Sequence, residues 1–255
     1  MSITDIIIIF ASIVVTSFIS GMLSLGGGTI LMGVFVWIMP VSLAMMLHGV
    51  TQFVSNGSRA VVYWKHIHWP VVSGYVVGAV TVTVLFSLVA YVPNKVVVFL
   101  LVGTLPFANF LVPKGYALDV TKRGGSHTCG AVNTAVMLTS GVSGPILDVF
   151  FVKTDLTRFQ TMATKGLIQS LAHVLKIIYF GGIIWLTTND FDTDLLPWWV
   201  FVVAVILSSG GNLIASRFVH KMTDAQFRKY AQWMTMAIGA TFFVRGILLW
   251  IEGGG

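Results

Sequence analysis

Apolar runs of about 20 residues recur along this chain, and each is long enough for a helix to cross the hydrocarbon core of a bilayer. Hydrophobic residues make up 56% of the sequence and charged residues only 9%, with a mean hydropathy of +0.90, which lies outside the usual soluble range. Because the bilayer core offers no water to exposed backbone groups, such runs are expected to cross it as helices. The sequence therefore predicts an all-α integral membrane protein, a polytopic helical bundle.

About ten segments are predicted, because glycine or proline interrupts two of the apolar stretches and leaves a short, broken or re-entrant helix after each break. Whether these two short helices cross the membrane is left open. The segments are expected near residues 3–23, 29–39, 42–63, 69–91, 94–112, 127–140, 146–151, 156–186, 196–219 and 225–251. The predicted organisation is a first membrane repeat at 1–113, a cytoplasmic linker at 114–126, a second membrane repeat at 127–252 and a flexible tail at 253–255.

Charges in the loops set the expected orientation. Basic residues gather in loops that a ten-segment path places on one side: Lys65, Lys114, Lys122, Arg123, Lys153, Arg158, Arg217, Lys221, Arg228 and Lys229. Acidic residues fall on the other side: Asp5, Asp190, Asp192, Asp194 and Glu252. By the positive-inside rule, the linker is cytoplasmic and both termini lie outside the cytoplasmic (inner) membrane. Since each half has five segments, an odd number, the second half enters from the opposite face, and the repeats have inverted topology.

One short motif occurs twice, 117 positions apart: His48-Gly49-Val50-Thr51-Gln52 and Lys165-Gly166-Leu167-Ile168-Gln169. A cation follows each glutamine after seven residues, Arg59 in the first copy and Lys176 in the second. A break that contains glycine lies upstream of each copy. A duplicated break, followed each time by a helix with polar and basic side chains, is typical of a secondary transporter built from two repeats.

The two breaks, at Gly26–Gly28 and at Gly141–Pro145, are predicted to unwind the chain at membrane depth. Glycine costs about 1 kcal/mol per residue in a helix relative to alanine, and proline cannot donate a backbone hydrogen bond. Unwound backbone in a membrane normally lines a cavity, and helices that begin there point their positive ends into it. We therefore expect backbone donation to a substrate from Gly26, Gly27, Gly28, Ser143 and Gly144. The alternative is that the glycines only allow close helix packing.

Polar side chains follow each break along one face of the next helix. At about 100° per residue, the first stripe is His48, Gln52, Ser55 and Arg59, and the second is Lys165, Gln169, His173 and Lys176. Ionisable groups inside a membrane are costly and usually face a cavity or a partner. We expect the two glutamines to donate hydrogen bonds to a substrate, and His48 and Lys165 to supply positive charge. Arg59 and Lys176 are expected to be gating or secondary cations, with snorkelling to the membrane surface as the alternative for Arg59.

Acidic and sulfur-containing residues are sparse at membrane depth. Asp148 is the only acid near the second break, and two roles are open to it, pairing with Lys165 or carrying a coupled proton. The single cysteine, Cys129, excludes an internal disulfide and a cysteine metal cage. We expect no metal, no cofactor and no nucleic-acid partner, since no basic run exists outside the loops. The expected partners are a small anionic substrate and the lipid bilayer, while a homo-oligomer is left open.

The glycines Gly21 and Gly26–Gly28 in the first half, and Gly144-Pro145-Ile146-Leu147 in the second, resemble the motifs of the sulfite/organosulfonate exporters, the TauE/SafE-type permeases. The likeness spans nearly the whole chain, although Val142 and Ser143 stand where glycines are more usual. The resemblance implies transport of a sulfur-containing or small organic anion across the cytoplasmic membrane. The residues point the same way, because the cations predicted at membrane depth outnumber Asp148 and helix N-termini favour negative charge.

Two other functions fit parts of the sequence. Gly141-Val142-Ser143-Gly144 has the G-x-S-G form found around the serine of rhomboid intramembrane proteases, with His173 downstream as a base. An anion channel is the second alternative. We expect no enzyme activity, because Ser143 belongs to a break that repeats the first one. The prediction is a transporter of sulfite, an organosulfonate or a related anion by alternating access, and without an ATP-binding P-loop motif a gradient is expected to drive it.

Overall fold

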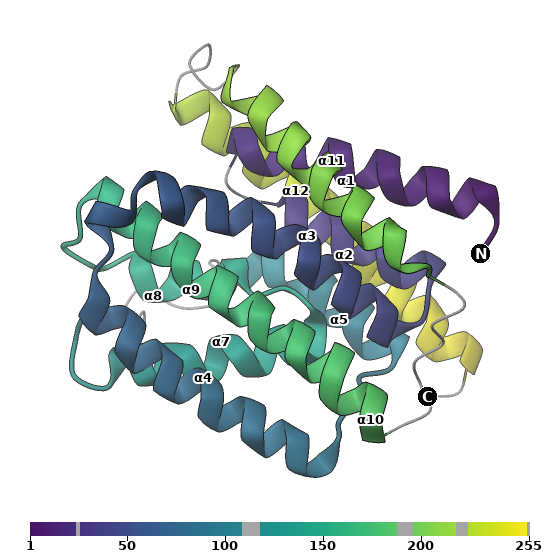
Figure 1. Ribbon diagram of the computed structural model, residues 1–255, viewed down its shortest axis with the longest axis horizontal. Coiled ribbons are helices and arrows are strands. Elements are labelled where there is room, and N and C mark those ends of the chain that lie inside the picture. Colours follow the sequence, from purple (N-terminus) through teal and green to yellow (C-terminus); the bar gives the residue numbers. More distant parts are fainter. Residues whose placement is uncertain (24–25, 109–117, 188–195, 218–223, 254–255) are drawn as a thin grey trace.

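The computed structural model describes residues 1–23, 26–108, 118–187, 196–217 and 224–253, and every regular element in this part of the chain is helical. The long helices run roughly along the long axis of the molecule (Figure 1). The elements are α1 (Ile3–Leu23), α2 (Gly27–Ile38), α3 (Val41–Val62), η1 (Trp64–His66), α4 (Trp69–Val89), α5 (Lys95–Thr104), η2 (Leu105–Phe107), α7 (Gly125–Ser140), α8 (Gly144–Phe151), α9 (Arg158–Ile178), the π-helical η4 (Tyr179–Ile184), α10 (Trp185–Thr187), α11 (Trp198–Ser216) and α12 (Asp224–Gly253). The predicted all-α fold is confirmed.

Helix length decides which segments can cross a bilayer. Five helical stretches are long and apolar enough: Ile3–Met22, Trp69–Val89, Arg158–Thr187, Trp198–Ala215 and Trp233–Gly253. The short helices α2 and α8 have 12 and 8 residues, so they measure about 18 and 12 Å against a hydrocarbon core of about 30 Å and cannot cross it. All eight tryptophans are at least 40% exposed, as expected of side chains that face lipid or its interface.

The two breaks have the same backbone device. Gly26, just before α2, and Gly141, just after α7, both have a φ of 80°. Glycine adopts this left-handed conformation without a steric penalty, so Gly26 lets the chain turn into α2 and Gly141 lets it turn out of α7. Local signals also fix the helices that follow, because Pro40 immediately precedes α3, and Thr157 with Gln160 forms a capping box at the start of α9.

Four helix pairs make the most extensive contacts, and each pair joins the first half of the chain to the second. The pairs are α3 with α9, α4 with α7, α1 with α11, and α5 with α12. In the predicted correspondence of the halves, α3 matches α9 and α5 matches α12, while the pair α1–α11 matches the pair α7–α4. Two repeats related by a two-fold axis would pack in this way. The division into repeats stays a prediction that this pattern supports.

Small residues let these pairs approach closely. A Cβ placed on Gly130 of α7 would lie only 3.0 Å from the backbone nitrogen of Ala79 in α4. In the matching pair, a Cβ on Gly211 of α11 would lie 2.8 Å from the Cβ of Ser17 in α1. Because neither position has room for a larger residue, both helix pairs depend on glycine.

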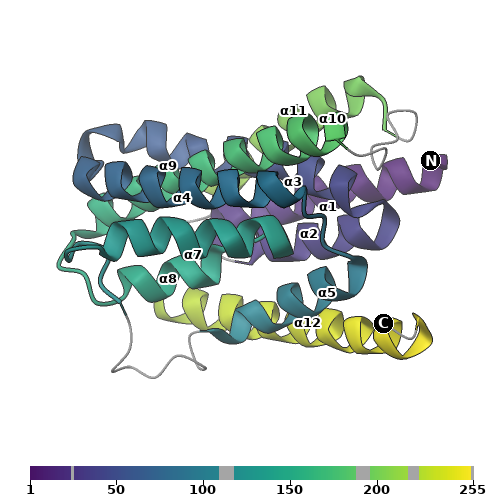
Figure 2. The ribbon, with the colours of Figure 1, turned by 90° about the horizontal axis from the view of Figure 1, so that it is seen from below.

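The two termini lie at the same end of the molecule (Figure 2). The turn between α3 and α4, which contains Lys65, and the connection between α8 and α9, which contains Lys153, lie at the opposite end (Figure 2). This separation is the one that the predicted orientation requires. The acidic loop at 190–194 and the residues Lys114 and Lys221 lie outside the described residues. Which end faces the cytoplasm therefore stays a prediction.

Candidate functional site

A cavity of about 340 Å³ lies between the two short helices, α2 and α8, and the polar faces of α3 and α9. Its lining includes Gly26, Gly28, His48, Gln52, Asn56 and Arg59 from the first half, and Ser143, Gly144, Asp148, Lys165, Gln169 and His173 from the second. Of the nine predicted substrate-binding residues, all except Gly27 line this cavity. The two cations that were expected to act as gating residues lie in different places. Arg59 lines the cavity, and Lys176 lies behind it.

The two polar stripes face each other because α3 packs along α9. One position differs from the sequence prediction. Asn56 lines the cavity, whereas the Ser55 hydroxyl donates to Asn212 Oδ1 on α11 at 3.4 Å. Asn56 follows Gln52 by four residues and Ser55 by three, and both spacings lie on the same helix face, so the sequence signal for Asn56 was as strong as the one for Ser55.

A chain of hydrogen bonds joins the two breaks at one end of the cavity, which we call the deep end and define by His48 and Lys176. His48 Nε2 lies 2.8 Å from the Gly28 carbonyl oxygen, so this nitrogen must carry a proton and donate. The ammonium of Lys176 has only donors, and its Nζ lies 2.7 Å from His48 Nδ1, which must therefore accept. Lys176 also donates to the Gly141 carbonyl oxygen at 2.9 Å. The His48 ring is thus neutral and links the first break, through Lys176, to the second.

Lys176 closes this end of the cavity. It is 0% exposed, and within the described part of the chain no carboxylate forms an ion pair with it. An imidazole and a carbonyl hold the ammonium instead, although burying an unpaired charge is costly. Farther from the cavity, the bundle is filled by the buried side chains of Met45, Tyr179 and Phe180.

Three buried side chains that line the cavity have no hydrogen-bond partner among the described residues. They are Gln52 at Nε2, Ser143 at Oγ and His173 at Nδ1, with 5%, 1% and 3% of each residue exposed. A buried polar group without a partner costs about 1–3 kcal/mol, so these three groups are available to water or to a polar ligand that fills the cavity. Ser143 and His173 do not bond to each other, so the nucleophile–base contact that defines the protease alternative is not formed between them.

The starts of both short helices open on the same cavity. Gly28 of α2 lies against the Gln52 amide and Gly144 of α8 against the Gln169 amide: Cβ atoms built on the glycines would lie 3.1 Å from Gln52 Oε1 and 3.4 Å from Gln169 Nε2. No side chain caps either helix start. The first-turn N–H groups, with the positive end of each helix dipole, are therefore left for another acceptor. An anion fits such a position.

Gly27 has a different role from its neighbours. A Cβ on Gly27 would collide with the Ser20 hydroxyl and with the backbone carbonyl of Thr16, both on α1. The side of Gly27 that would carry a Cβ therefore faces α1, because the short helix α2 packs closely against the helix that precedes it. Backbone donation from Gly27 to a substrate, which the sequence predicted, stays a prediction.

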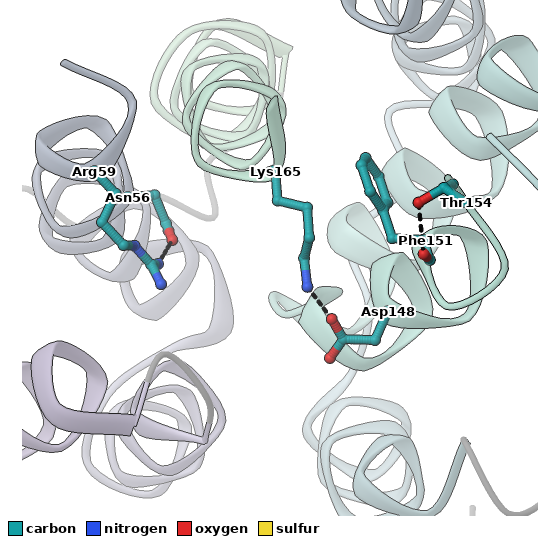
Figure 3. Close-up of polar contacts among 6 residues, drawn as sticks. All are labelled: Asn56, Arg59, Asp148, Phe151, Thr154 and Lys165. Carbon is teal, nitrogen blue, oxygen red and sulfur yellow. Dashed lines mark hydrogen bonds and ion pairs between the residues drawn. The ribbon is translucent and has the colours of Figure 1, made fainter. Parts of the chain in front are cut away.

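Charged side chains surround the other end of the cavity, which we call the mouth and define by Arg59, Asp148 and Lys165 (Figure 3). Lys165 Nζ forms an ion pair with Asp148 Oδ1, and 23% and 22% of the two side chains are exposed. The Arg59 guanidinium donates to Asn56 Oδ1 on its own helix. Of the two roles predicted for Asp148, pairing with Lys165 is the one that the structure contains, and proton coupling stays a prediction.

A family profile described as sulfite exporter TauE/SafE matches residues 9–242. The chain belongs to this family. The match covers both breaks and both polar helices, and it confirms the resemblance predicted from the glycine motifs. The protein is therefore a polytopic membrane transporter by family, which favours a permease over an enzyme. Neither the curated proteins nor the solved structures that were compared with the chain contain a match.

Proposed function

We propose that this protein is a secondary transporter that moves sulfite, an organosulfonate or a related small sulfur-containing or organic anion by alternating access. The observation that carries the proposal is the cavity at the two breaks, where three buried side chains without partners meet two uncapped helix starts. Membership in the sulfite exporter family supplies the transporter class. The cavity supplies a place where one anion would bind.

The donors around the cavity match the chemistry of an oxyanion. Sulfite and sulfonates present several oxygen atoms that share negative charge, so they need hydrogen-bond donors from more than one direction. Gln52 offers its amide from α3, and Ser143 offers its hydroxyl from the start of α8. The free N–H groups of both helix starts add further donors. At the mouth, Arg59 and Lys165 carry two positive charges against the single charge of Asp148.

The position of the cavity along the helices supports one state of the transporter. Its lining runs along α3 from His48, near the middle, to Arg59, near the α3–α4 turn, and along the first part of α9 from Thr161 to His173. The α3–α4 turn and the start of α9 lie at the end opposite the termini (Figure 2). With the termini outside, as the loop charges predict, this is an inward-facing state of a protein in the cytoplasmic membrane. The buried contact between His48 and Lys176 then closes the path to the outside.

The driving force belongs to the same proposal. We assign it to an ion gradient or to the gradient of the substrate itself. Asp148 is the candidate carrier of a coupled proton, because it is partly exposed at the mouth and already bonded to Lys165. Proton binding to Asp148 would release Lys165 for the substrate, which gives a physical link between the two.

Transport by purified protein in liposomes tests the proposal. Gln52→Leu removes the amide that has no partner, and the half-saturation concentration for radiolabelled sulfite should rise about tenfold, the effect of one hydrogen bond to a charged group. Ser55→Ala is the matched control, because Ser55 lies on the same helix, is buried and bonds to Asn212 outside the cavity. It should leave the half-saturation concentration unchanged.

The same vesicles separate a carrier from a channel. In a carrier, vesicles preloaded with unlabelled sulfite should accumulate labelled sulfite transiently by counterflow. Equal half-saturation values for wild type and Gln52→Leu would place the binding site elsewhere. Flux that does not saturate and shows no counterflow would favour the anion channel.

A further inference from the structure

The duplicated motif forms duplicated contacts across α3 and α9. A Cβ on Gly49, the residue after His48, would lie 3.4 Å from Lys176 Cε. A Cβ on Gly166, the residue after Lys165, would lie 3.5 Å from Arg59 Cβ. Each glycine thus touches the cation that stands seven residues after the glutamine of the other copy. The two ends of the α3–α9 pair are therefore built alike, the deep end around Lys176 and the mouth around Arg59.

This equivalence assigns a partner to Arg59. At the deep end, which is closed, Lys176 reaches across to His48, the first residue of the other motif. The first residue of the second motif is Lys165, so the corresponding contact at the mouth is between Arg59 and Lys165. Inverted repeats change state by exchanging their conformations. When the mouth closes and the deep end opens, Arg59 and Lys165 take the relation that Lys176 and His48 have now.

The two contacts differ in charge. At the deep end Lys176 donates a hydrogen bond to Nδ1 of the neutral His48 ring. At the mouth both residues are cations and neither can accept. In the present open state they are held apart, because Lys165 reaches toward Asp148 on α8 while Arg59 turns to Asn56 (Figure 3). One carboxylate cannot neutralise two cations that are brought together in a water-poor site.

We propose that Arg59 and Lys165 form the inner gate and that this gate closes only around an anion, the transported substrate itself. The proposal rests on the proposed function and adds the selecting residues and the order of events. An anion bound between the guanidinium and the ammonium supplies the acceptor that the mouth lacks. An empty cavity leaves the two cations to repel each other, so the empty carrier stays open to the inside.

Exchange follows from this gate. Because the empty carrier rests open to the inside, an anion outside reaches the site only after a loaded carrier has turned outward, so anion on the inside accelerates uptake of anion from the outside. Replacing Lys165 with histidine gives the mouth the residue type that the deep end has in His48. A neutral imidazole accepts from Arg59, so the empty carrier becomes able to close.

Two uptake rates of labelled sulfite that enters at the outer face of the carrier test the gate: uptake into anion-free liposomes, and uptake into liposomes loaded with unlabelled sulfite. For the wild type, the second should exceed the first about tenfold, within the usual range of a ligand's effect on a conformational equilibrium. For Lys165→His the ratio should fall toward one because uptake into anion-free liposomes accelerates. Lys65→His is the matched control, since Lys65 is exposed in η1 at the same end of the molecule and does not line the cavity. Its ratio should equal that of the wild type.

A second measurement reports closure without flux. Thr161 lines the cavity near the mouth, so Thr161→Cys, in a chain in which Cys129 is replaced by serine, should react with a membrane-impermeant maleimide from the cytoplasmic side. A saturating alkylsulfonate, which unlike sulfite does not add to maleimide, should slow this reaction when Lys165 is present. With Lys165→His, the reaction should already be slow in the absence of the alkylsulfonate.

The outcomes distinguish the gate from the transport function. If Lys165→His changes neither the flux ratio nor the labelling rate in a protein that transports sulfite, the gate is overturned and the proposed function stays intact. Labelling that the alkylsulfonate slows only when Lys165 is present, in a protein that moves no anion, supports the gate and overturns transport. Absence of any anion effect on either measurement overturns both.

Discussion

At the scale of single residues, the contact between His48 and Lys176 is the least expected feature of this protein. A lysine with no exposed surface has an imidazole and a carbonyl as partners in place of a carboxylate. The arrangement works because the Gly28 carbonyl holds the proton of His48 on Nε2 and leaves Nδ1 free to accept. His48 donates to the Gly28 carbonyl at the first break, and Lys176 donates to the Gly141 carbonyl at the second. The stability of the two breaks therefore depends on these two side chains.

A double-mutant cycle should show this dependence. His48→Leu leaves the Lys176 ammonium with one acceptor, and the loss of a hydrogen bond to a charged group should lower the free energy of unfolding by about 1.5–3 kcal/mol. Adding Lys176→Met removes the charge that lost its acceptor, so the double variant should be more stable than His48→Leu alone. Thermal unfolding in detergent measures the order of stability of the wild type, the two single variants and the double variant. Simple additivity of the two changes would show that the residues do not act together.

Anion affinity should respond in opposite directions to changes at the mouth. Lys165→Gln removes a cation that lines the cavity and should weaken sulfite binding by about 1–3 kcal/mol. Asp148→Asn removes the partner that now occupies Lys165 and should tighten binding. Calorimetric titration with sulfite measures both. If Asp148 carries the coupled proton, Asp148→Asn should also abolish the pH dependence of uptake, whereas a purely structural partner leaves that dependence in place.

At the scale of elements, the short helix α2 presents different sides to α1 and to the cavity. Gly27 meets the backbone of α1, which cannot move aside, while Gly28 meets the ends of the Gln52 and His48 side chains, and the nearer of these, the Gln52 amide, can rotate. The same kind of residue therefore has a packing role at one position and a role in access to the site at the next.

Adjacent substitutions should separate these roles. Gly27→Ala should push α2 away from α1 and lower the free energy of unfolding by about 1–3 kcal/mol, the usual cost of overpacking. Gly28→Ala should keep wild-type stability but displace the Gln52 amide and impair sulfite uptake. Thermal unfolding and liposome uptake, measured on both variants, give the comparison. A stable, inactive Gly27→Ala protein would support the predicted role of Gly27 at the substrate site.

The sequence predicts helices better than it predicts contacts between them. The first segment was expected at 3–23 and is found at Ile3–Leu23, because an apolar run bounded by a glycine break defines both of its ends. By contrast, Tyr179–Ile184 is π-helical within a segment expected to be one regular helix, and no local pattern marks it. Ser55 and Asn56 differ by one position, which helical periodicity cannot resolve. The bond from Lys176 to His48 depends on the register of α3 against α9, which neither helix specifies alone.

At the scale of the whole molecule, loop charge and fold give one expected orientation. Lys65 lies in the turn after α3, and Lys95 lies at the start of α5, near the end that holds the termini (Figure 2). Single cysteines at these positions, in a chain in which Cys129 is replaced by serine, should react with an impermeant maleimide from opposite sides of the membrane. Lys65→Cys should react from the cytoplasmic side and Lys95→Cys from the outside. Reaction of both from the same side would contradict the inverted arrangement.

The four helix pairs that hold the bundle together all cross from one half of the chain to the other, and this has a consequence for biosynthesis. When the first five helices have entered the membrane, α1, α3, α4 and α5 do not yet have their main partners. These helices remain in the membrane without their partners, and the polar face of α3 stays uncovered, until α7, α9, α11 and α12 are translated. A chain cut in the polar connection between the halves should still assemble when both pieces are made together, and either piece made alone should be degraded.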